Sequence, residues 1–342
     1  MDIKAAIAKV TSLQDLSTAE MIAVMNDIMS GKTSDAQNAG FLVGLQMKGA
    51  KVFEILGGAT VMRELATPVS VADKSFLVDT CGTGGSGSNT FNVSTAAAIV
   101  ASAAGAKVAK HGNRGATSKS GSADVLEVAG VNLGLSAEGV AKCIEEIGVG
   151  FMFAPAHHSA MKHVIAARKE IGVRTVFNLL GPLTNPAAAP NQLMGVYDAG
   201  LIPVLLEVLK SLGSKHVLIV AAEDGLDEIS IAASTTVGEL KDGVITHYQV
   251  KPSDFGLDMY ADYYSLQINS AEESLVMLKG ALSNTNKAAA DIVALNAGAA
   301  IYVAGKATSL ADGVEKAKAI LVAGDALAKL EKLVALSNSL AL

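Results

Sequence analysis

A glycine-rich stretch at residues 79–95 carries the residue types that point most directly to chemistry. It follows a short apolar run and contains four glycines, Gly82, Gly84, Gly85 and Gly87. It ends at Asn92-Val-Ser94-Thr95, directly before an alanine-rich helical pattern. Glycines allow a tight turn and leave backbone N–H groups accessible, and hydroxyl residues cap a helix start. Since helix N-termini attract anions, we predict a phosphate-binding loop at the carboxyl end of a strand.

A steric explanation remains open for this loop, because many strand-to-helix turns contain glycine only for their geometry. The loop lacks the Walker A pattern, and no acidic residue stands in the ribose-binding place of a Rossmann unit. A generic nucleotide-binding fold is therefore not the favoured interpretation.

A second segment, rich in positive charge and hydrogen-bond donors, covers residues 110–122 and follows the apolar residues Val108-Ala109. Its 13 residues include two lysines, one arginine, four hydroxyl residues and three glycines. Lysine supplies a point charge, and hydroxyl and N–H groups supply hydrogen-bond donors, so the segment suits a phosphorylated ligand. The alternative is a solvated surface loop that ends in an N-cap at Ser122. Two anion-type loops after successive strands favour the ligand, because both would open at the same edge of a sheet.

Carboxylates follow another apolar run, in Asp224-Gly-Leu-Asp227-Glu228. Adjacent carboxylates at a strand end can hold Mg²⁺, with water and substrate phosphates completing its coordination. A turn with solvated acids is the alternative. Two phosphate-binding loops favour the metal site, because a polyphosphate ligand usually carries Mg²⁺.

Histidines are concentrated in residues 151–168, at His157, His158 and His163. A zinc site is not favoured, because adjacent histidines diverge on a helix and spacings of five and six do not share one face. Arg168 follows and could grip a ligand carboxylate as a planar fork, or it could be an ordinary surface arginine.

The first 70 residues predict helices throughout. Ser17-Thr-Ala-Glu20 is a capping box before an apolar helical pattern, with Gly31 placed to end that helix. Ser34-Asp-Ala-Gln37 opens another helix, and a third covers about 52–66, before Pro68. The apolar faces of such a small unit could pack within the chain or form a dimer contact, and we expect the dimer.

From about residue 75 short apolar runs alternate with helical patterns. Strands are predicted at 76–79, 106–109, 148–153, 193–197 and 216–221. Helices are predicted at 94–104, 122–129, 136–147, 158–171 and 200–212. This alternation is typical of an α/β fold with a mainly parallel sheet, helices on both faces, and the active site at the carboxyl ends of the strands. Residues 236–249 predict a hairpin around Asp242-Gly243, and three helices finish the chain at 271–282, 287–304 and 309–337.

Composition and short sequence patterns argue against several classes of protein. The net charge of −6 argues against a general affinity for nucleic acid or anionic membranes. Cys81 and Cys143 lack metal-binding spacing, and neither a signal-peptide pattern nor an apolar run of membrane length is present. We expect a cytoplasmic protein of 342 residues with two domains: a helical one at 1–70, joined by helices from about 170–190, and an α/β domain at 73–342.

Taken together, these segments resemble the anthranilate phosphoribosyltransferase family. The match runs through Gly82-Thr-Gly-Gly85, Asn92-Val-Ser-Thr95, Lys110-His-Gly-Asn113-Arg114, Ser118-Lys-Ser-Gly121, Phe153-Ala-Pro155, His158-Ser-Ala-Met-Lys162, Arg174-Thr-Val-Phe-Asn-Leu-Leu-Gly-Pro-Leu-Thr-Asn-Pro186 and Asp224-Gly-Leu-Asp-Glu-Ile-Ser230. The Lys-His-Gly and Ser-Lys-Ser-Gly pieces also resemble pyrimidine nucleoside phosphorylases, and the 174–186 segment favours the transferase. The family commonly has Asp where this chain has Ser86, and often His-Gly where this chain has Ala221-Ala222-Glu223.

The resemblance implies transfer of a phosphoribosyl group from 5-phosphoribosyl 1-pyrophosphate to anthranilate, in tryptophan biosynthesis, in a cleft between the two domains. It implies that the donor contacts Gly82, Gly85, Ser86, Thr90, Asn92, Ser94, Thr95, Lys110, Asn113, Ser118 and Ser122. It implies Mg²⁺ on Ser94, Asp227 and Glu228, and anthranilate at Gly82, Asn113 and Arg168, with His111 and His158 as neighbours. Lys110, Asn113 and Arg168 are the expected catalytic residues, and the expected assembly is a homodimer.

The chemistry agrees with this allocation. Pyrophosphate leaves as the anomeric carbon becomes cationic, so stabilisation of the departing charge by Mg²⁺ and Lys110 is the main need. The anthranilate amine already carries a lone pair and needs positioning, so no dedicated general base is expected. Closure of the 110–122 loop would exclude water, the competing nucleophile. Alternatives are a nucleoside phosphorylase, a non-catalytic nucleic-acid-binding relative, or an enzyme of another pathway that uses the same donor.

Overall fold

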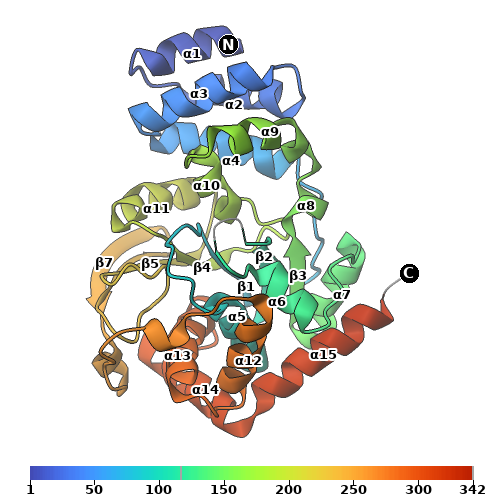
Figure 1. Cartoon of the computed structure of the whole chain (residues 1–342), viewed down its shortest axis with the longest axis vertical. Helices are drawn as coiled ribbons and strands as arrows, with labels where there is room; N and C mark the ends of the chain where they lie inside the picture. The colour runs from blue at the N-terminus through green and yellow to red at the C-terminus, as the bar shows by residue number, and fades with distance from the viewer. Residues whose placement is uncertain (116–117, 341–342) are drawn as a thin grey trace.

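The computed structural model describes residues 1–115 and 118–340. Four helices open the chain: α1 (Ile3–Thr11), α2 (Thr18–Met29), α3 (Asp35–Lys48) and α4 (Val52–Glu64). Both predicted capping boxes are present, Ser17 with Glu20 on α2 and Ser34 with Gln37 on α3. These helices form the upper part of the molecule in Figure 1.

A seven-stranded sheet forms the centre of the rest of the chain (Figure 1). Its strands are β1 (Leu77–Gly82), β2 (Lys107–Gly112), β3 (Val149–Phe153), β4 (Asn191–Gly195), β5 (His216–Ala222), β6 (Thr235–Lys241) and β7 (Val244–Val250). The order is β3-β2-β1-β4-β5-β6-β7, in which β1 to β5 are parallel and β6 pairs antiparallel with both β5 and β7. The five predicted strands and the hairpin are confirmed, and Asp242 and Gly243 adopt the positive φ of its turn, +49° and +82°.

The direction in which successive strands are added to the sheet reverses between β1 and β4. Strands β2 and β3 extend the sheet from one side of β1, and β4 and β5 extend it from the other. Ligands of such sheets bind outside the carboxyl ends of the strands at this switch point. Gly82 of β1 and Gly195 of β4 are paired there, so the glycine-rich loop begins at the switch.

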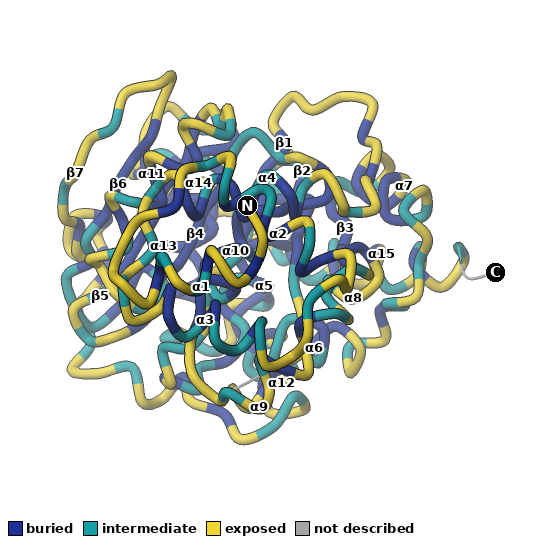
Figure 2. The backbone as a smooth tube through the Cα atoms, turned by 90° about the horizontal axis from the view of Figure 1, so that it is seen from above, coloured by how far each residue is buried: buried dark blue, intermediate teal, exposed yellow. Residues whose placement is uncertain are grey.

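Helices cover both faces of the sheet. They are α5 (Val93–Ala103), α6 (Ser122–Val128), α7 (Ala137–Ile147), α11 (Ile202–Ser211), α12 (Ala271–Leu282), α13 (Lys287–Val303), α14 (Leu310–Ala323) and α15 (Asp325–Ser339). Strand residues alternate between two cores: Leu218 and Val220 of β5 pack with α5 and α13, whereas Val217 and Ile219 pack with α11 and the helical part. Figure 2 shows this buried interior in dark blue, with exposed loops in yellow around it.

Two predicted helices were wrong in extent. The 309–337 helix is two helices, α14 and α15, because Gly324 adopts the left-handed conformation that ends α14, with φ +78°. The predicted 158–171 helix is instead a 3₁₀ turn (Ser159–His163) followed by α9 (Ile165–Ile171), and a separate short helix, α8 (Ala154–His157), breaks off just before His158. The His158 backbone, with φ −119° and ψ 58°, is not helical, which explains the break.

A further short helix, α10 (Val176–Leu180), lies in the 170–190 region from which helices were expected to join the N-terminal ones. Its residues Val176, Phe177 and Leu180 are buried in the same core as α2, α3 and α4. Arg63 of α4 donates a hydrogen bond of 2.6 Å to the Leu183 carbonyl just beyond it. The segment after β3 therefore packs on the four N-terminal helices. Within the described residues, no helix combines the length and apolar character needed to cross a membrane.

Candidate functional site

Asp227 and Glu228 lie in the loop after β5, close to the end of β4. A Cβ atom on Gly195 would lie 1.7 Å from the Asp227 carbonyl oxygen, so only glycine at this position lets the acidic loop approach. A Cβ on Gly82 would lie 3.3 Å from Oδ2 of Asp227. The acidic loop and the start of the glycine-rich loop are therefore in contact at the switch point between β1 and β4.

The two carboxyl groups hold protons more tightly than ordinary acids. Burial, and then the charge of Asp227, raise the pKa of Glu228 to about 8, although Lys110 and the Ser94 backbone N–H oppose the shift. Burial also raises the pKa of Asp227, and a hydrogen bond from Ser86 opposes it. Both groups thus lack enough positive charge nearby to offset their desolvation.

Lys110, near the end of β2, is only 3% exposed. Its ammonium donates to the Thr80 carbonyl oxygen and, at 3.2 Å, to the hydroxyl of Ser94 on α5. Burial lowers its pKa, and the charges of Asp79, Cys81 and Glu228 oppose that shift. Lys110 is therefore a buried cation that lies close to the half-buried Ser94 and Glu228.

The residues predicted to hold Mg²⁺ present hard oxygen ligands: two carboxylates and the Ser94 hydroxyl. Mg²⁺ is commonly held by one or two carboxylates, with waters and substrate phosphates completing its octahedral shell. The raised pKa values of Asp227 and Glu228 are what an acid pair shows before a cation neutralises it. The donor set therefore fits Mg²⁺. Among the described residues, no group of three or more His, Cys, Asp and Glu side chains could hold a metal by itself.

The glycine-rich loop lies over this group. Its root is held by a hydrogen bond of 2.9 Å from the Thr83 N–H to the Gly195 carbonyl. Gly85 has φ +85°, and the Ser86 and Ser88 hydroxyls are 3.1 Å apart. Thr90 forms an isolated bridge with Gln267, whose side chain donates to the Ser88 carbonyl at 2.9 Å.

The predicted capping of α5 by hydroxyl residues was wrong. The N-cap is Asn92, and its side chain makes no capping hydrogen bond. Its Oδ1 instead accepts from the Ser120 hydroxyl at 2.8 Å and the Ser274 hydroxyl at 2.7 Å. Asn92 thus ties the first turn of α5 to the 110–122 loop and to α12. The Thr95 hydroxyl, one turn along, is buried and has no hydrogen-bond partner in the described part of the chain.

The remaining predicted residues of the 110–122 loop bond mainly within the loop itself. Ser118 donates to the Ser120 carbonyl at 3.2 Å, and Ser122 donates to the Asn113 carbonyl at 3.4 Å. Asn113 is exposed, and its side chain accepts from the Arg114 N–H at 2.8 Å. Residues 116 and 117 of this predicted loop lie outside the described residues.

Arg168 on α9 stands apart from this network. Its guanidinium lies 5.3 Å from the centre of the Phe177 ring, and burial lowers its pKa. His111 and His158 are buried, with ring centres 5.0 Å apart. Burial, followed by neighbouring histidines, lowers their pKa values to about 3 and about 4. Both imidazoles are therefore neutral at physiological pH.

Two residues of this region were not assigned from the sequence. Arg174 lies in the quoted 174–186 segment, and its guanidinium donates to the Gly85 carbonyl. The 174–186 motif was the sequence feature from which Arg174 could have been assigned to the site. Ser274 lies 182 residues from Asn92 in the chain and has no sequence signal of its own.

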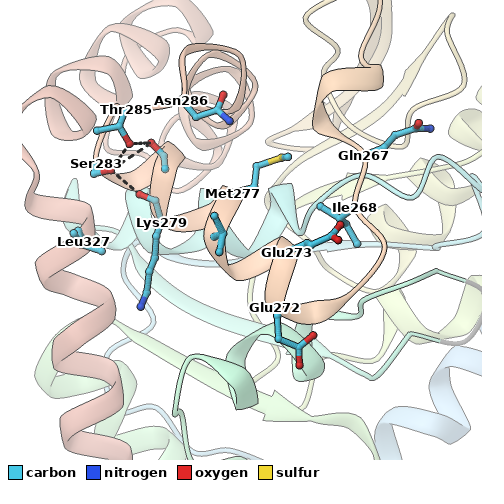
Figure 3. A pocket seen from close by; sticks show the side chains of 12 residues that line it. Gln267, Ile268, Glu272, Glu273, Met277, Lys279, Ser283, Thr285, Asn286 and Leu327 are labelled. Atoms are coloured by element: carbon cyan, nitrogen blue, oxygen red, sulfur yellow. Dashed lines mark hydrogen bonds between the residues drawn. The ribbon is translucent and has the colours of Figure 1, made fainter.

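A cavity of about 740 Å³ lies outside this constellation, between α12, the start of α13 and α15 (Figure 3). Its wall includes Gln267 and Ile268, which hold the glycine-rich loop from the other side. None of the predicted site residues lines it.

Comparisons with known proteins identify the family of the two parts of the chain. Residues 74–327 match the model of the glycosyl transferase family, a/b domain, and residues 4–66 match that of the glycosyl transferase family, helical bundle domain. The anthranilate phosphoribosyltransferase of Hydrogenovibrio crunogenus is 57% identical over 95% of this chain and 96% of its own length.

Solved structures extend the likeness to three dimensions. The anthranilate phosphoribosyltransferase of Thermus thermophilus has a TM-score of 0.91 at 42% identity, over 97% of this chain and 99% of that one. The Saccharomyces cerevisiae enzyme in complex with PRPP and Mg has a TM-score of 0.90 at 29% identity, over 98% of both chains. The chain therefore belongs to the glycosyl transferase family with a helical bundle and an a/b domain, and within it to the anthranilate phosphoribosyltransferases.

Proposed function

We propose that this protein transfers the phosphoribosyl group of 5-phosphoribosyl 1-pyrophosphate to the amine of anthranilate and releases pyrophosphate, a step of tryptophan biosynthesis. The observation that carries the proposal is the buried Lys110 close to the half-buried Ser94 and Glu228 at the switch point of the sheet, with Asp227 beside them. Relatives that match nearly the whole chain are named anthranilate phosphoribosyltransferase.

The donor binds along the glycine-rich loop and the first turn of α5. Backbone N–H groups of the loop and the N-terminus of α5 suit its phosphates. One side of the donor contacts the glycine-rich loop and the start of α5, at Gly82, Gly85, Ser86, Thr90, Asn92, Ser94 and Thr95. Its other side contacts the 110–122 loop, at Lys110, Asn113, Ser118 and Ser122. The Thr95 hydroxyl, which has no hydrogen-bond partner among residues 1–115 and 118–340, supports this assignment, because a buried polar atom without a partner suits a ligand.

Asp227, Glu228 and Ser94 hold Mg²⁺. When bound, the ion neutralises negative charge on the pyrophosphate as it leaves. The structure of the yeast relative with PRPP and Mg supports the use of this metal. Lys110 remains fixed by Thr80 and Ser94, and contributes a positive charge that needs no reorganisation during the reaction.

Arg168 receives the carboxylate of anthranilate, and Gly82 and Asn113 complete its site. A structure of the yeast relative is a complex with 4-fluoroanthranilate, which supports an aromatic acid as ligand. Because His111 and His158 have lowered pKa values, they offer neutral rings to the aromatic acceptor and do not compete with Arg168 for its carboxylate. The anthranilate nitrogen attacks with its own lone pair, so the site needs to orient it rather than to deprotonate it.

The reaction takes place between the helical domain at 1–70, with its partner helices from about 170–190, and the α/β domain at 73–342. The packing of α10 against α4 supports this division. Closure of the 110–122 loop keeps water from the cationic sugar carbon. Its attachment to α5 through Ser120 and Asn92 gives the loop a fixed root for that movement.

The assembly is a homodimer formed through the helical domain, in the cytoplasm. Leu13, after α1, and Met47, in the last turn of α3, are 69% and 80% exposed, which supports an apolar contact there. Light scattering of Met47→Glu tests this: a shift to monomer is expected, and an unchanged dimer would contradict the contact. The proposed activity itself is tested by loss of anthranilate fluorescence with donor and Mg²⁺.

A further inference from the structure

Arg174 reaches from the α9–α10 connection to the glycine-rich loop. The carbon of its guanidinium lies 3.9 Å from the centre of the Tyr197 ring, and Nη2 donates a hydrogen bond to the Gly85 carbonyl oxygen. α9 and α10 pack on the N-terminal helices, whereas Tyr197 follows β4 of the sheet. One side chain therefore joins the helical part of the molecule to a loop and a strand of the α/β part.

The loop and the arginine fit each other closely. Gly85 has φ +85°, a conformation that other residues rarely adopt. A Cβ atom at this position would lie 3.3 Å from both Nε and Nη2 of Arg174. Glycine at position 85 thus provides both the turn and the space for the guanidinium.

The middle of the loop is the part that needs such a contact. Its ends are held: Thr83 donates to Gly195, Phe91 donates to Leu266, and the Asn89 carbonyl accepts from Ile268. Between them Gly84, Gly85 and Gly87 all have positive φ, and glycine has the largest conformational freedom to lose on ordering. The hydrogen bond from Arg174 restrains the peptide group between Gly85 and Ser86, whose N–H points toward the opposite side from its carbonyl.

We propose that Arg174, seated on Tyr197, is a positioning residue that holds the glycine-rich loop in the conformation that receives the phosphates of the donor. The proposal rests on the proposed function, because it assigns the donor to this loop. Arg174 acts through the Gly85 carbonyl and the shape of the loop, and its own charge is not a ligand of the donor. Tyr197 provides the flat surface that aims the guanidinium.

The kinetic test compares Arg174→Gln with Lys169→Gln, which removes an exposed positive charge on the same segment. Arg174→Gln should raise the KM for the donor about ten-fold, which corresponds to a loss of about 1.4 kcal/mol of binding free energy. The KM for anthranilate should change by less than about two-fold. Lys169→Gln should change neither. An unchanged donor KM in Arg174→Gln overturns the proposal.

Two further variants separate positioning from direct charge. Arg174→Lys keeps the charge but loses the planar fork, so it should not restore the donor KM. Tyr197→Leu should reproduce part of the defect, and the Arg174→Gln/Tyr197→Leu double variant should be no worse than Arg174→Gln alone. Full rescue by lysine, or additive defects of the two single variants, overturns the proposal.

Hydrogen exchange of the free protein tests the loop independently of turnover. Peptides that cover residues 83–91 should exchange faster in Arg174→Gln than in the wild type, and not in Lys169→Gln. If the wild type fails to consume anthranilate while this difference is present, the proposed function is wrong and the positioning contact stands. If the wild type is active and the exchange is unchanged, the positioning proposal is wrong and the function stands.

Discussion

The hydroxyl of Ser274 on α12 donates a hydrogen bond of 2.7 Å to Oδ1 of Asn92, the first residue before α5. The same hydroxyl accepts the Asn92 backbone N–H at 3.1 Å. Ser274 is fully buried, and Oδ1 of Asn92 also accepts from Ser120. A helix near the end of the chain thus fixes the rotamer of a residue proposed to contact the donor.

Ser274→Ala should therefore affect both stability and donor binding. The variant leaves the partly buried Asn92 N–H without this partner, which costs about 1 kcal/mol of unfolding free energy. It also removes one of the hydrogen bonds that orient the Asn92 side chain and leaves those with Ser120, so the donor KM should rise while the anthranilate KM stays the same. Urea denaturation and steady-state kinetics measure the two effects. Val276→Ala on the exposed side of α12 is the control, and a stability loss with an unchanged donor KM would disprove the link to Asn92.

Asp227→Asn combined with Glu228→Gln should abolish the response to Mg²⁺ without weakening the fold. Because burial raises the pKa of both carboxyl groups, their neutral analogues remove an unfavourable charge pair, and the melting temperature should stay level or rise. Turnover at saturating Mg²⁺ should fall roughly 100-fold or more, since a charge-stabilising group is lost. A Mg²⁺ titration of turnover, with the exposed Glu223→Gln as control, checks this. A wild-type Mg²⁺ response in the double variant would refute the metal assignment.

Arg168→Ala should act on the acceptor alone. Among the ion pairs of the described residues Arg168 has none, so its partly buried guanidinium is available to a ligand carboxylate. Loss of a charge-assisted pair should raise the anthranilate KM about ten- to one-hundred-fold and leave the donor KM close to wild type. Arg168→Lys retains the charge without the fork and should be intermediate. A defect confined to the donor would count against the assignment.

A polar network at the opposite end of β5 should affect stability and its pH dependence. Glu239 accepts hydrogen bonds of 2.8 to 2.9 Å from His216, Tyr302 and Tyr248. Burial raises the pKa of this carboxyl, but the hydrogen bonds from these three residues lower it more, so the net pKa lies below the ordinary 4.5. Such a group stabilises the fold above its unfolded pKa and loses that contribution as the pH falls through its folded pKa.

Glu239→Gln should therefore cost about 1–3 kcal/mol of unfolding free energy near pH 7. The difference in unfolding free energy between the variant and the wild type should narrow as the pH falls below the ordinary 4.5 of this carboxyl group and through its lowered folded pKa. Denaturant unfolding at several pH values measures this, with the exposed Glu207→Gln as the control. A gap that stays constant with pH would show that the ionised carboxylate is not the stabilising form.

The sequence predicted the parallel strands well because β1 to β5 are short and largely buried, and β1, β2 and β4 end in a glycine. The capping boxes at Ser17 and Ser34 likewise depend on neighbouring residues only. The errors lie where local pattern competes with backbone detail. The periodic pattern from 309 to 337 continues through Gly324, and a positive φ at that single residue separates α14 from α15.

The site was predictable only in part, for a similar reason. Short motifs supplied Lys110, Ser94 and Asp227, which the parallel sheet brings to one edge. The partners that orient them come from distant segments: Ser274 on α12 fixes Asn92, and Arg174 fixes Gly85. Such pairings depend on tertiary packing, and no spacing along the chain encodes them.

The most direct test of the central claim is the fluorescence of anthranilate in the presence of the purified protein, 5-phosphoribosyl 1-pyrophosphate and Mg²⁺. We predict a loss of fluorescence that requires all three components and is accompanied by stoichiometric release of pyrophosphate. No loss at high protein concentration, or consumption of the donor with anthranilate unchanged, would contradict the account.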